Sequence, residues 1–306
     1  MSPVTNAVFM PAIVGSRETA PAPARAPRPF YWSVRRELWE NRSIVVAPLA
    51  IATFAVVALV VHAITMPSHM PGLLANDPAS GGSAFSTYTI ASILTLLTMP
   101  VVGAFYCVDA LSGERRDRSI LFWKSLPVSD RTTVLAKAAI PLLVLPLITF
   151  AATLAMHVTL LLLSVAALLV QGESAAPLWR ELQLWRMWPS LLFALGATAL
   201  WLAPVYACLL LVSGWARRTA ALWAVLPLLA LGVLEKLAFD TLYVQALVQH
   251  RVFGWYFLAF VPTKSAPLSS STPGRFLASP ALWLGLALAV AFLAAAVLLR
   301  RRREPF

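Results

Sequence analysis

The chain has 306 residues, of which 59% are hydrophobic and only 12% are charged, and its mean hydropathy is +0.77. About a quarter of the residues of a soluble domain are charged, so this composition excludes an ordinary soluble domain and predicts a multi-pass membrane protein. The formal net charge is +11. The arginines flank apolar stretches, as topology signals do, so we do not expect nucleic-acid binding.

The first 43 residues precede the apolar stretches. Residues 1–29 are rich in proline and contain the run APAPARAPRP, which predicts a disordered cytosolic tail. Residues 30–43 place apolar and polar side chains on opposite arcs of a helical wheel, which predicts an amphipathic helix at the membrane interface. The alternative is a plain extension of the first span. The helix carries two flanking indoles, which favour the headgroup level, and two arginines: Trp32, Trp39, Arg35 and Arg36.

The apolar stretches are long enough to cross a bilayer as helices, which takes about 20 residues each, and they lack the alternation of membrane β-strands. The predicted class is therefore an all-α helical bundle, with a transmembrane domain over residues 44–299. The six predicted spans are 44–65, 85–108, 134–170, 189–212, 219–238 and 279–299. The third exceeds one crossing and contains Pro141 and Pro146, so we expect it to be tilted, kinked or to begin in the cytosol.

The distribution of Lys and Arg predicts the orientation. With the N-terminus inside, 18 of the 24 basic residues fall on the cytosolic side and five on the opposite side, while Lys236 lies near the outer end of the fifth span. This asymmetry predicts that both termini are cytosolic, including the basic tail at residues 300–306. Residues 239–278 then form an external segment, which we expect to be interfacial or partly re-entrant.

Residues 109–137 form the longest charged island between apolar stretches. Glu114 and Arg118 stand at helical i,i+4 spacing, which predicts that the second span continues into this island. Pro127 then ends the helix, and Ser129 or Asp130 can cap the next one. The middle of the island is apolar and rimmed by charge, which suggests either membrane-surface insertion or docking into the groove of a partner. The apolar residues are Ile120, Leu121, Phe122, Trp123 and Leu126.

The motifs of several enzyme classes are missing from the sequence. No G-x-x-x-x-G-K-[ST] loop is present, and the four histidines and two cysteines are scattered, so we expect no nucleotide, cofactor, metal or catalytic site in this chain. For His157, in mid-span, we expect a buried hydrogen bond to a neighbouring helix, the alternative being a substrate or proton pathway. For Glu235, beside Lys236, we expect a structural pair, the alternative being a coupling site.

The residues of the island carry a resemblance. The run ERRDRSILFWKSLPVSD at residues 114–130, followed by Lys137, resembles the first cytosolic connection of permeases of the second class of ATP-binding cassette (ABC) exporters. In that family an acidic–basic pair precedes a short apolar stretch, a Leu-Pro-Val/Ile-Ser step and a lysine at the start of the third span. The likeness extends to the six spans and the interfacial helix. The proline-rich tail is not part of the family pattern.

The resemblance implies a permease of the bacterial inner membrane that forms a dimer with a second permease copy. A separate ATPase subunit would bind ATP and Mg and would dock on the 109–137 connection. Glu114 and Arg115 would be the charged pair of this coupling element, and residues 120–126, followed by Pro127, would face the ATPase groove. The resemblance indicates export but not the substrate.

Two rival functions remain open. A secondary transporter that needs no ATPase would be expected to hold midplane carboxylates or duplicated broken helices, and neither is visible, although several prolines lie in the spans. An intramembrane enzyme would need catalytic polar residues that face one another inside the spans. The spans offer only His62, His157 and Glu235, which form no plausible triad.

Overall fold

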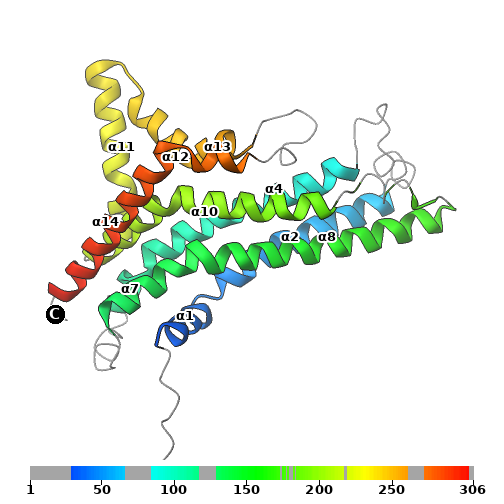
Figure 1. Cartoon of the computed structure of the whole chain (residues 1–306), viewed down its shortest axis with the longest axis horizontal. Helices are drawn as coiled ribbons and strands as arrows, with labels where there is room; N and C mark the ends of the chain where they lie inside the picture. Colours follow the sequence, from blue (N-terminus) through cyan, green and yellow to red (C-terminus); the bar gives the residue numbers. More distant parts are fainter. Residues whose placement is uncertain are drawn as a thin grey trace, which may run out of the picture.

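The computed structural model describes residues 29–65, 84–116, 129–172, 174–176, 178, 182, 184–216, 219–260 and 272–302. Across these ranges the protein is helical and contains no strand (Figure 1). Six helices are long and apolar enough to cross a membrane, at or close to the predicted spans, which confirms the all-α class and the count of six candidate spans within the described ranges. They are Ser43–His62, Tyr88–Glu114, Asp130–Val170, Leu184–Trp215, Ala220–Phe239 and Pro280–Arg302.

Four long helices lie side by side and form most of the bundle (Figure 1). Helix α8 packs on α2 and α4, whereas α10 packs on α4 and on the last helix, α14. The main core surrounds α10, which contributes Trp201 and Tyr206, two of the largest fully buried side chains. The four are α2 (Ser43–Thr65), α4 (Ala84–Ala110), α8 (Leu145–Val170) and α10 (Leu184–Trp215), and the last helix is α14 (Pro280–Arg302).

The third predicted span is one long helix with a local irregularity. It consists of α7 (Asp130–Ala139), a π-helical turn, η3 (Ile140–Val144), and α8. The hydroxyl of Ser129 caps α7 by accepting a hydrogen bond from the Thr132 N–H at 3.1 Å, so the helix starts four residues before the predicted span. The π-turn contains Pro141, whose missing N–H removes one α-helical hydrogen bond and favours a local widening.

The chain between α10 and α14 leaves the bundle and then returns to it. Helix α11 (Ala220–Phe239) projects away from the other helices (Figure 1), and none of its apolar window is buried. Helix α12 (Tyr243–Ala259) turns back and packs on α10, and the short α13 (Pro273–Leu277) follows. Gly254 of α12 lies against Trp201, which is close to the middle of α10.

Candidate functional site

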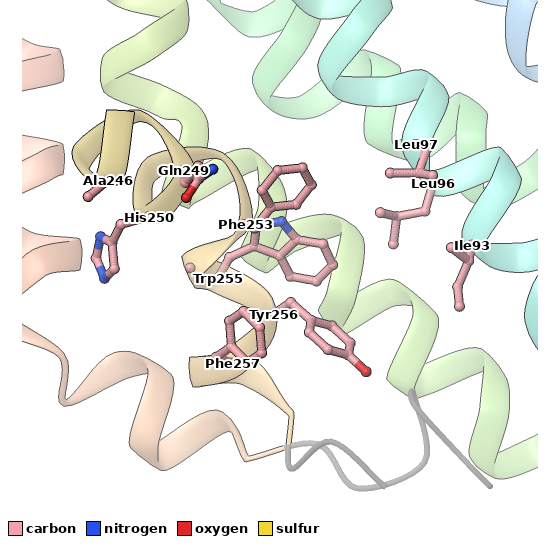
Figure 2. A pocket seen from close by; sticks show the side chains of 11 residues that line it. Ile93, Leu96, Leu97, Ala246, Gln249, His250, Phe253, Trp255, Tyr256 and Phe257 are labelled. Atoms are coloured by element: carbon pink, nitrogen blue, oxygen red, sulfur yellow. The ribbon is translucent and has the colours of Figure 1, made fainter. Parts of the chain in front are cut away.

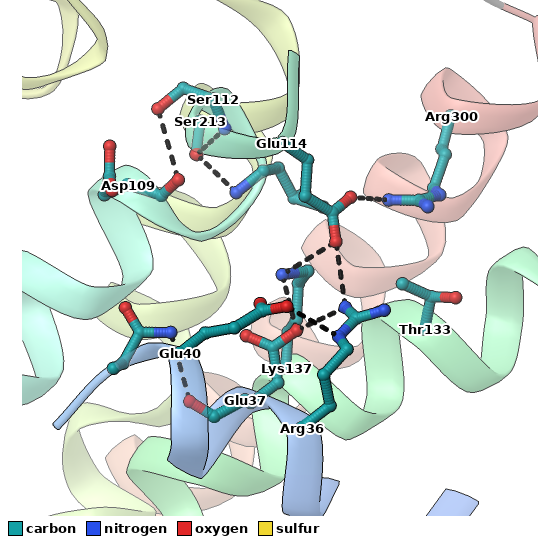
Figure 3. A network of polar contacts seen from close by, with 12 residues as sticks. Arg36, Glu37, Glu40, Asp109, Ser112, Glu114, Thr133, Lys137, Ser213 and Arg300 are labelled. Atoms are coloured by element: carbon teal, nitrogen blue, oxygen red, sulfur yellow. Dashed lines mark hydrogen bonds and ion pairs between the residues drawn. The ribbon is translucent and has the colours of Figure 1, made fainter. Parts of the chain in front are cut away.

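A buried cluster of charged side chains lies where four helices meet at one end of the bundle (Figure 3). We call it the charge network. Glu37 and Lys137 are only 1% and 2% exposed, so neither can rely on water and each needs a partner of opposite charge. The members come from α1 (Pro29–Glu40), α5 (Ser112–Arg116), α7 and α14, and they are Arg36, Glu37, Glu114, Asp130, Lys137 and Arg300.

Two cations hold two carboxylates at the centre of the network. The Nζ atom of Lys137 lies 2.8 Å from Glu37 Oε1 and 3.1 Å from Glu114 Oε1. The Nη2 atom of Arg36 lies 2.7 Å and 3.1 Å from the same two oxygens. The hydroxyl of Tyr106 donates to the other oxygen of Glu37 at 2.8 Å. The two acidic side chains are therefore held together by shared cations, which makes the cluster a single unit rather than separate pairs.

Arg300 extends the network to both ends of the connection between α5 and α7. Its Nη1 donates to Glu114 Oε2 and its Nε donates to Asp130 Oδ1, both at 2.9 Å. Glu114 lies in α5, shortly before residues 117–128, and Asp130 opens α7 shortly after them. The guanidinium of Arg300 on α14 thus joins the helix that precedes residues 117–128 to the helix that follows them.

The corner between α4 and α5 is also fixed, through its backbone N–H groups. Helix α4 ends at Ala110 and α5 starts at Ser112. The buried hydroxyl oxygen of Ser213 on α10 accepts the Leu111 N–H at 3.0 Å and the Ser112 N–H at 2.9 Å. The N–H groups at the start of a helix have no acceptor within that helix and need a partner elsewhere. Here the Ser213 hydroxyl on α10 is the acceptor. The corner between α4 and α5 is therefore fixed to α10.

Arg36 of the charge network and its neighbour Glu40 both have shifted pKa values. Burial lowers the pKa of Arg36, but its hydrogen bond to Glu37 and the charges of Glu37, Glu40 and Glu114 outweigh that effect and raise the pKa above its usual range. Burial raises the pKa of Glu40 by more than the charge of Arg36 lowers it. Arg36 therefore keeps its charge at any physiological pH, whereas Glu40 takes up a proton at a higher pH than an ordinary glutamate.

The structure places the predicted residues of the connection as follows. Glu114 belongs to the charge network, where its partners are Arg36, Lys137 and Arg300. The side chain of Arg115 lies outside the described residues, so the predicted charged pair stays a prediction. The predicted docking residues also lie outside them, namely Ile120, Leu121, Phe122, Trp123, Leu126 and Pro127.

The aromatic residues of α1 point away from the charge network. Trp32 and Trp39 are 57% and 70% exposed, and the guanidinium of Arg35 lies 5.3 Å and 4.9 Å from the centroids of their rings. The neighbouring Arg36 turns inward instead. The helical wheel gave no sign that Glu37, on the predicted polar arc, is buried against the bundle.

Sequence reasoning missed most of the network. Arg300 was predicted only as part of the basic cytosolic tail, and Glu37 only as one of the polar side chains of the predicted amphipathic helix. One signal was available, because Lys137 lies inside the apolar run VLAKAAIPLLV. A lysine in such a run needs an acidic partner from another helix, but the sequence alone does not say which acid supplies it.

His157 is buried in a chain of hydrogen bonds between helices. The indole N–H of Trp188 donates to His157 Nδ1 at 3.3 Å, so the ring proton resides on Nε2, which lies 2.9 Å from Ser92 Oγ. The Ser92 hydroxyl donates in turn to the Tyr88 carbonyl at 2.7 Å. Both ring nitrogens are thus engaged in the neutral form, which favours the structural interpretation of His157 over a proton pathway.

Replacing His157 by leucine tests this interpretation. We expect a stability loss of about 1 kcal/mol, because hydrogen bonds between membrane helices contribute modestly. Unfolding in mixed micelles measures this loss, with Thr159→Ala as the control because, among the described residues, the Thr159 hydroxyl bonds to the Ala155 carbonyl of its own helix. An unchanged stability of the His157→Leu variant would contradict the structural interpretation and favour the pathway alternative.

Glu235 has a structural role at the corner between α11 and α12, but not as a partner of Lys236. Its carboxylate accepts hydrogen bonds from the Thr241 hydroxyl at 2.7 Å and from the N–H groups of Tyr243 and Val244 at the start of α12. Lys236 pairs with Asp240 instead. A carboxylate at a helix N-terminus satisfies free N–H groups and complements the helix dipole.

Comparisons with protein-family models, with curated proteins and with solved structures find no match. Among the described residues, no group of three or more His, Cys, Asp or Glu side chains could hold a metal ion. The charge network is therefore interpreted from its own geometry. Its acids and bases neutralise one another and join four helices, an arrangement suited to transmitting movement between them.

Proposed function

We propose that this chain is the permease subunit of an ABC exporter of the second class, and that a separate ATPase subunit drives it by docking on residues 109–137. The observation that carries the proposal is the charge network. Through Glu114, Asp130, Lys137 and Arg300, the network joins both ends of this connection to the bundle. Because both ends of the connection are anchored in this way, a displacement of the connection also displaces the transmembrane helices.

In the proposed topology both termini and the charge network lie on the cytosolic side of a bacterial inner membrane. The excess of Lys and Arg in the segments assigned to that side supports this orientation. Helix α1 then lies in the interface, with Trp32 and Trp39 at the headgroup level and Arg35 between them. The exposure of both indoles supports this placement. The indole ring is apolar and its N–H group needs a hydrogen-bond acceptor, and the headgroup level offers both environments.

The proposed mechanism is mechanical coupling. ATP and Mg are bound by the ATPase, and its closure displaces the connection. The displacement reaches α4 through α5, α10 through Ser213, α8 through α7, and α14 through Arg300. Coupling of this kind requires that the ATPase and the transport pathway bias the same two arrangements of the helices.

A second permease copy is part of the proposal. Helix α11 is apolar, and none of its membrane window is buried within one chain, so it offers a face for a second copy. The translocation path would lie between the two copies. Its lining by the second and fifth spans is carried over from the family.

Copurification tests the proposed docking. In a strain that expresses the partner ATPase, the double substitution Leu121→Asp and Phe122→Asp is expected to abolish recovery of the ATPase with the permease, because charges at an apolar docking surface are costly to bury. The control is Ser125→Asp, which adds charge to the same connection without removing an apolar side chain. Recovery of the full complex with the double variant would show that this stretch contacts the membrane surface instead.

A further inference from the structure

Helix α1 turns one side toward the bundle and the other side away from it. The inner side packs against the main core through two apolar side chains, Val34 and Leu38. On the outer side both indoles are exposed, and a guanidinium lies 5.3 Å and 4.9 Å from the centroids of their rings. The link to α2 adds an exposed arginine. We call these four residues the aromatic–basic surface: Trp32, Arg35, Trp39 and Arg42.

The two arginines of this surface have no counter-charge. Arg35 and Arg42 form no ion pair within the described ranges. The acidic residues of α1 are engaged elsewhere, because Glu37 is buried in the charge network and Glu40 pairs with Arg36. The surface therefore carries two uncompensated positive charges, which attract an anionic partner.

The chain places this surface beside the edge of the membrane. The first candidate span, Ser43–His62, has 20 residues, which at 1.5 Å per residue equal about 30 Å, the thickness of a hydrocarbon core. Ser43 then lies at the boundary of the hydrocarbon, and Arg42 lies directly outside it. The rest of the surface is within about three turns of Arg42 along α1, and exposed indoles favour the headgroup level.

The chemistry of the surface fits the headgroup of an anionic lipid. An arginine that stacks on aromatic rings still offers its N–H donors to a phosphate, which it binds in a bidentate manner. An indole ring buries its apolar part at the hydrocarbon boundary and keeps its N–H group among the headgroups. A bilayer supplies both the anion and the hydrocarbon boundary at the depth where the surface lies.

We propose that the aromatic–basic surface binds anionic phospholipids of the leaflet in which α1 lies. The position of α1 at the interface is taken from the proposed function, and the charge of the lipid goes beyond it. Arg36 and Glu37 directly follow Arg35 and belong to the charge network. A lipid held on the outer side of α1 therefore also holds the helix that carries two members of the network, and so stabilises the network.

The protein has a second place for lipid that differs in charge. An apolar cavity of about 650 Å³ lies between α4 and α12, where the aromatic side chains of α12 face aliphatic side chains of α4 (Figure 2). Its lining contains no acidic residue, lysine or arginine. We expect an acyl chain in this cavity to bind without regard to headgroup charge. A preference for anionic over zwitterionic lipid must therefore come from elsewhere on the protein.

Native mass spectrometry of the purified full-length protein tests the surface, using the ratio of bound phosphatidylglycerol to phosphatidylcholine from an equimolar mixture. Each basic residue near an anionic surface contributes about fivefold in affinity. We expect the ratio to fall about fivefold in Arg35→Gln and about 20-fold when Arg42→Gln is added. The matched control is Lys236→Gln, which should change the ratio by less than about twofold because Asp240 already compensates Lys236.

A second variant separates this surface from a general effect of positive charge. Trp32→Leu with Trp39→Leu leaves the net charge unchanged but removes the rings that flank Arg35. We expect the ratio to fall about threefold, the usual worth of a cation–π contact. The side chains that are replaced are exposed or half-buried, so we expect all of these variants to fold.

Two results would overturn the inference. The first is an unchanged ratio in the double arginine variant, and the second is an unchanged ratio in the double tryptophan variant, which would mean that lipids respond to net charge alone. If the double arginine variant instead lost the ATPase on copurification while its lipid ratio stayed unchanged, the surface would belong to a protein partner. The lipid measurement needs no ATPase, so it can fail while the proposed docking holds, and the reverse.

Discussion

Replacing Lys137 by methionine is expected to lower the free energy of unfolding by about 3 kcal/mol or more. The ammonium is 2% exposed and pairs with both Glu37 and Glu114. Its removal leaves two buried carboxylates with only part of their counter-charge, and removing one partner of a buried ion pair typically costs about 3–5 kcal/mol. Chemical unfolding of the purified protein in mixed micelles measures the loss.

Two further variants make this prediction specific to the network. Lys236→Met removes a lysine that is 54% exposed and whose ion-pair partner among the described residues is Asp240, so we expect it to cost less than about 1 kcal/mol. Adding Glu37→Gln to Lys137→Met removes one of the two carboxylates that lost counter-charge and should recover part of the lost stability, because residues of one network are not additive. Equal losses for the two lysine variants would mean that the network does not stabilise the fold.

The second large effect is expected on coupling. Glu114→Gln keeps the shape of the side chain but weakens its bonds to Arg36, Lys137 and Arg300. We expect the proposed partner ATPase to stay bound, because the proposed docking residues are unchanged, while stimulation of its activity by the proposed transport falls about tenfold. Such a loss corresponds to about 1.4 kcal/mol, within the usual range of coupling free energies. ATPase activity of the reconstituted complex measures it.

The control for this prediction comes from the edge of the same cluster. Glu40 is 48% exposed at its side chain and lies 3.5 Å from Arg36 as its sole ion pair among the described residues. Glu40→Gln should therefore leave coupling within about twofold of wild type. Full stimulation in Glu114→Gln would remove the charge network from the proposed mechanism, and loss of the bound ATPase would show that Glu114 acts in docking.

The spans could be predicted because each depends on local composition alone. Long apolar runs such as PLLVLPLI at residues 141–148 are unsuited to water, and only a helix satisfies their backbone in lipid. The Ser129 cap was one of two local candidates, and the structure confirms it. The course of residues 239–278 could not be predicted, because α12 depends on a carboxylate eight residues before it, Glu235, and on packing against Trp201.

The candidate site was predicted only in part, for a physical reason. Glu114 was identified from its place in a short pattern, whereas its partners come from positions 36, 137 and 300. Pairing between residues so far apart in the sequence is decided by how the helices pack, so no spacing rule along the chain predicts it.

The π-turn at Ile140–Val144 sets the rotational phase of the long third helix. Lys137 and Leu145 are both buried and stand eight residues apart. In an ideal α-helix eight residues turn about 80° beyond two full revolutions, which would move the two side chains onto different faces. A π-turn accommodates one extra residue and takes back about 100° of rotation. Because of this local unwinding, the continuous helix α7–η3–α8 keeps its buried side chains on one face, from the charge network to the interior of the bundle.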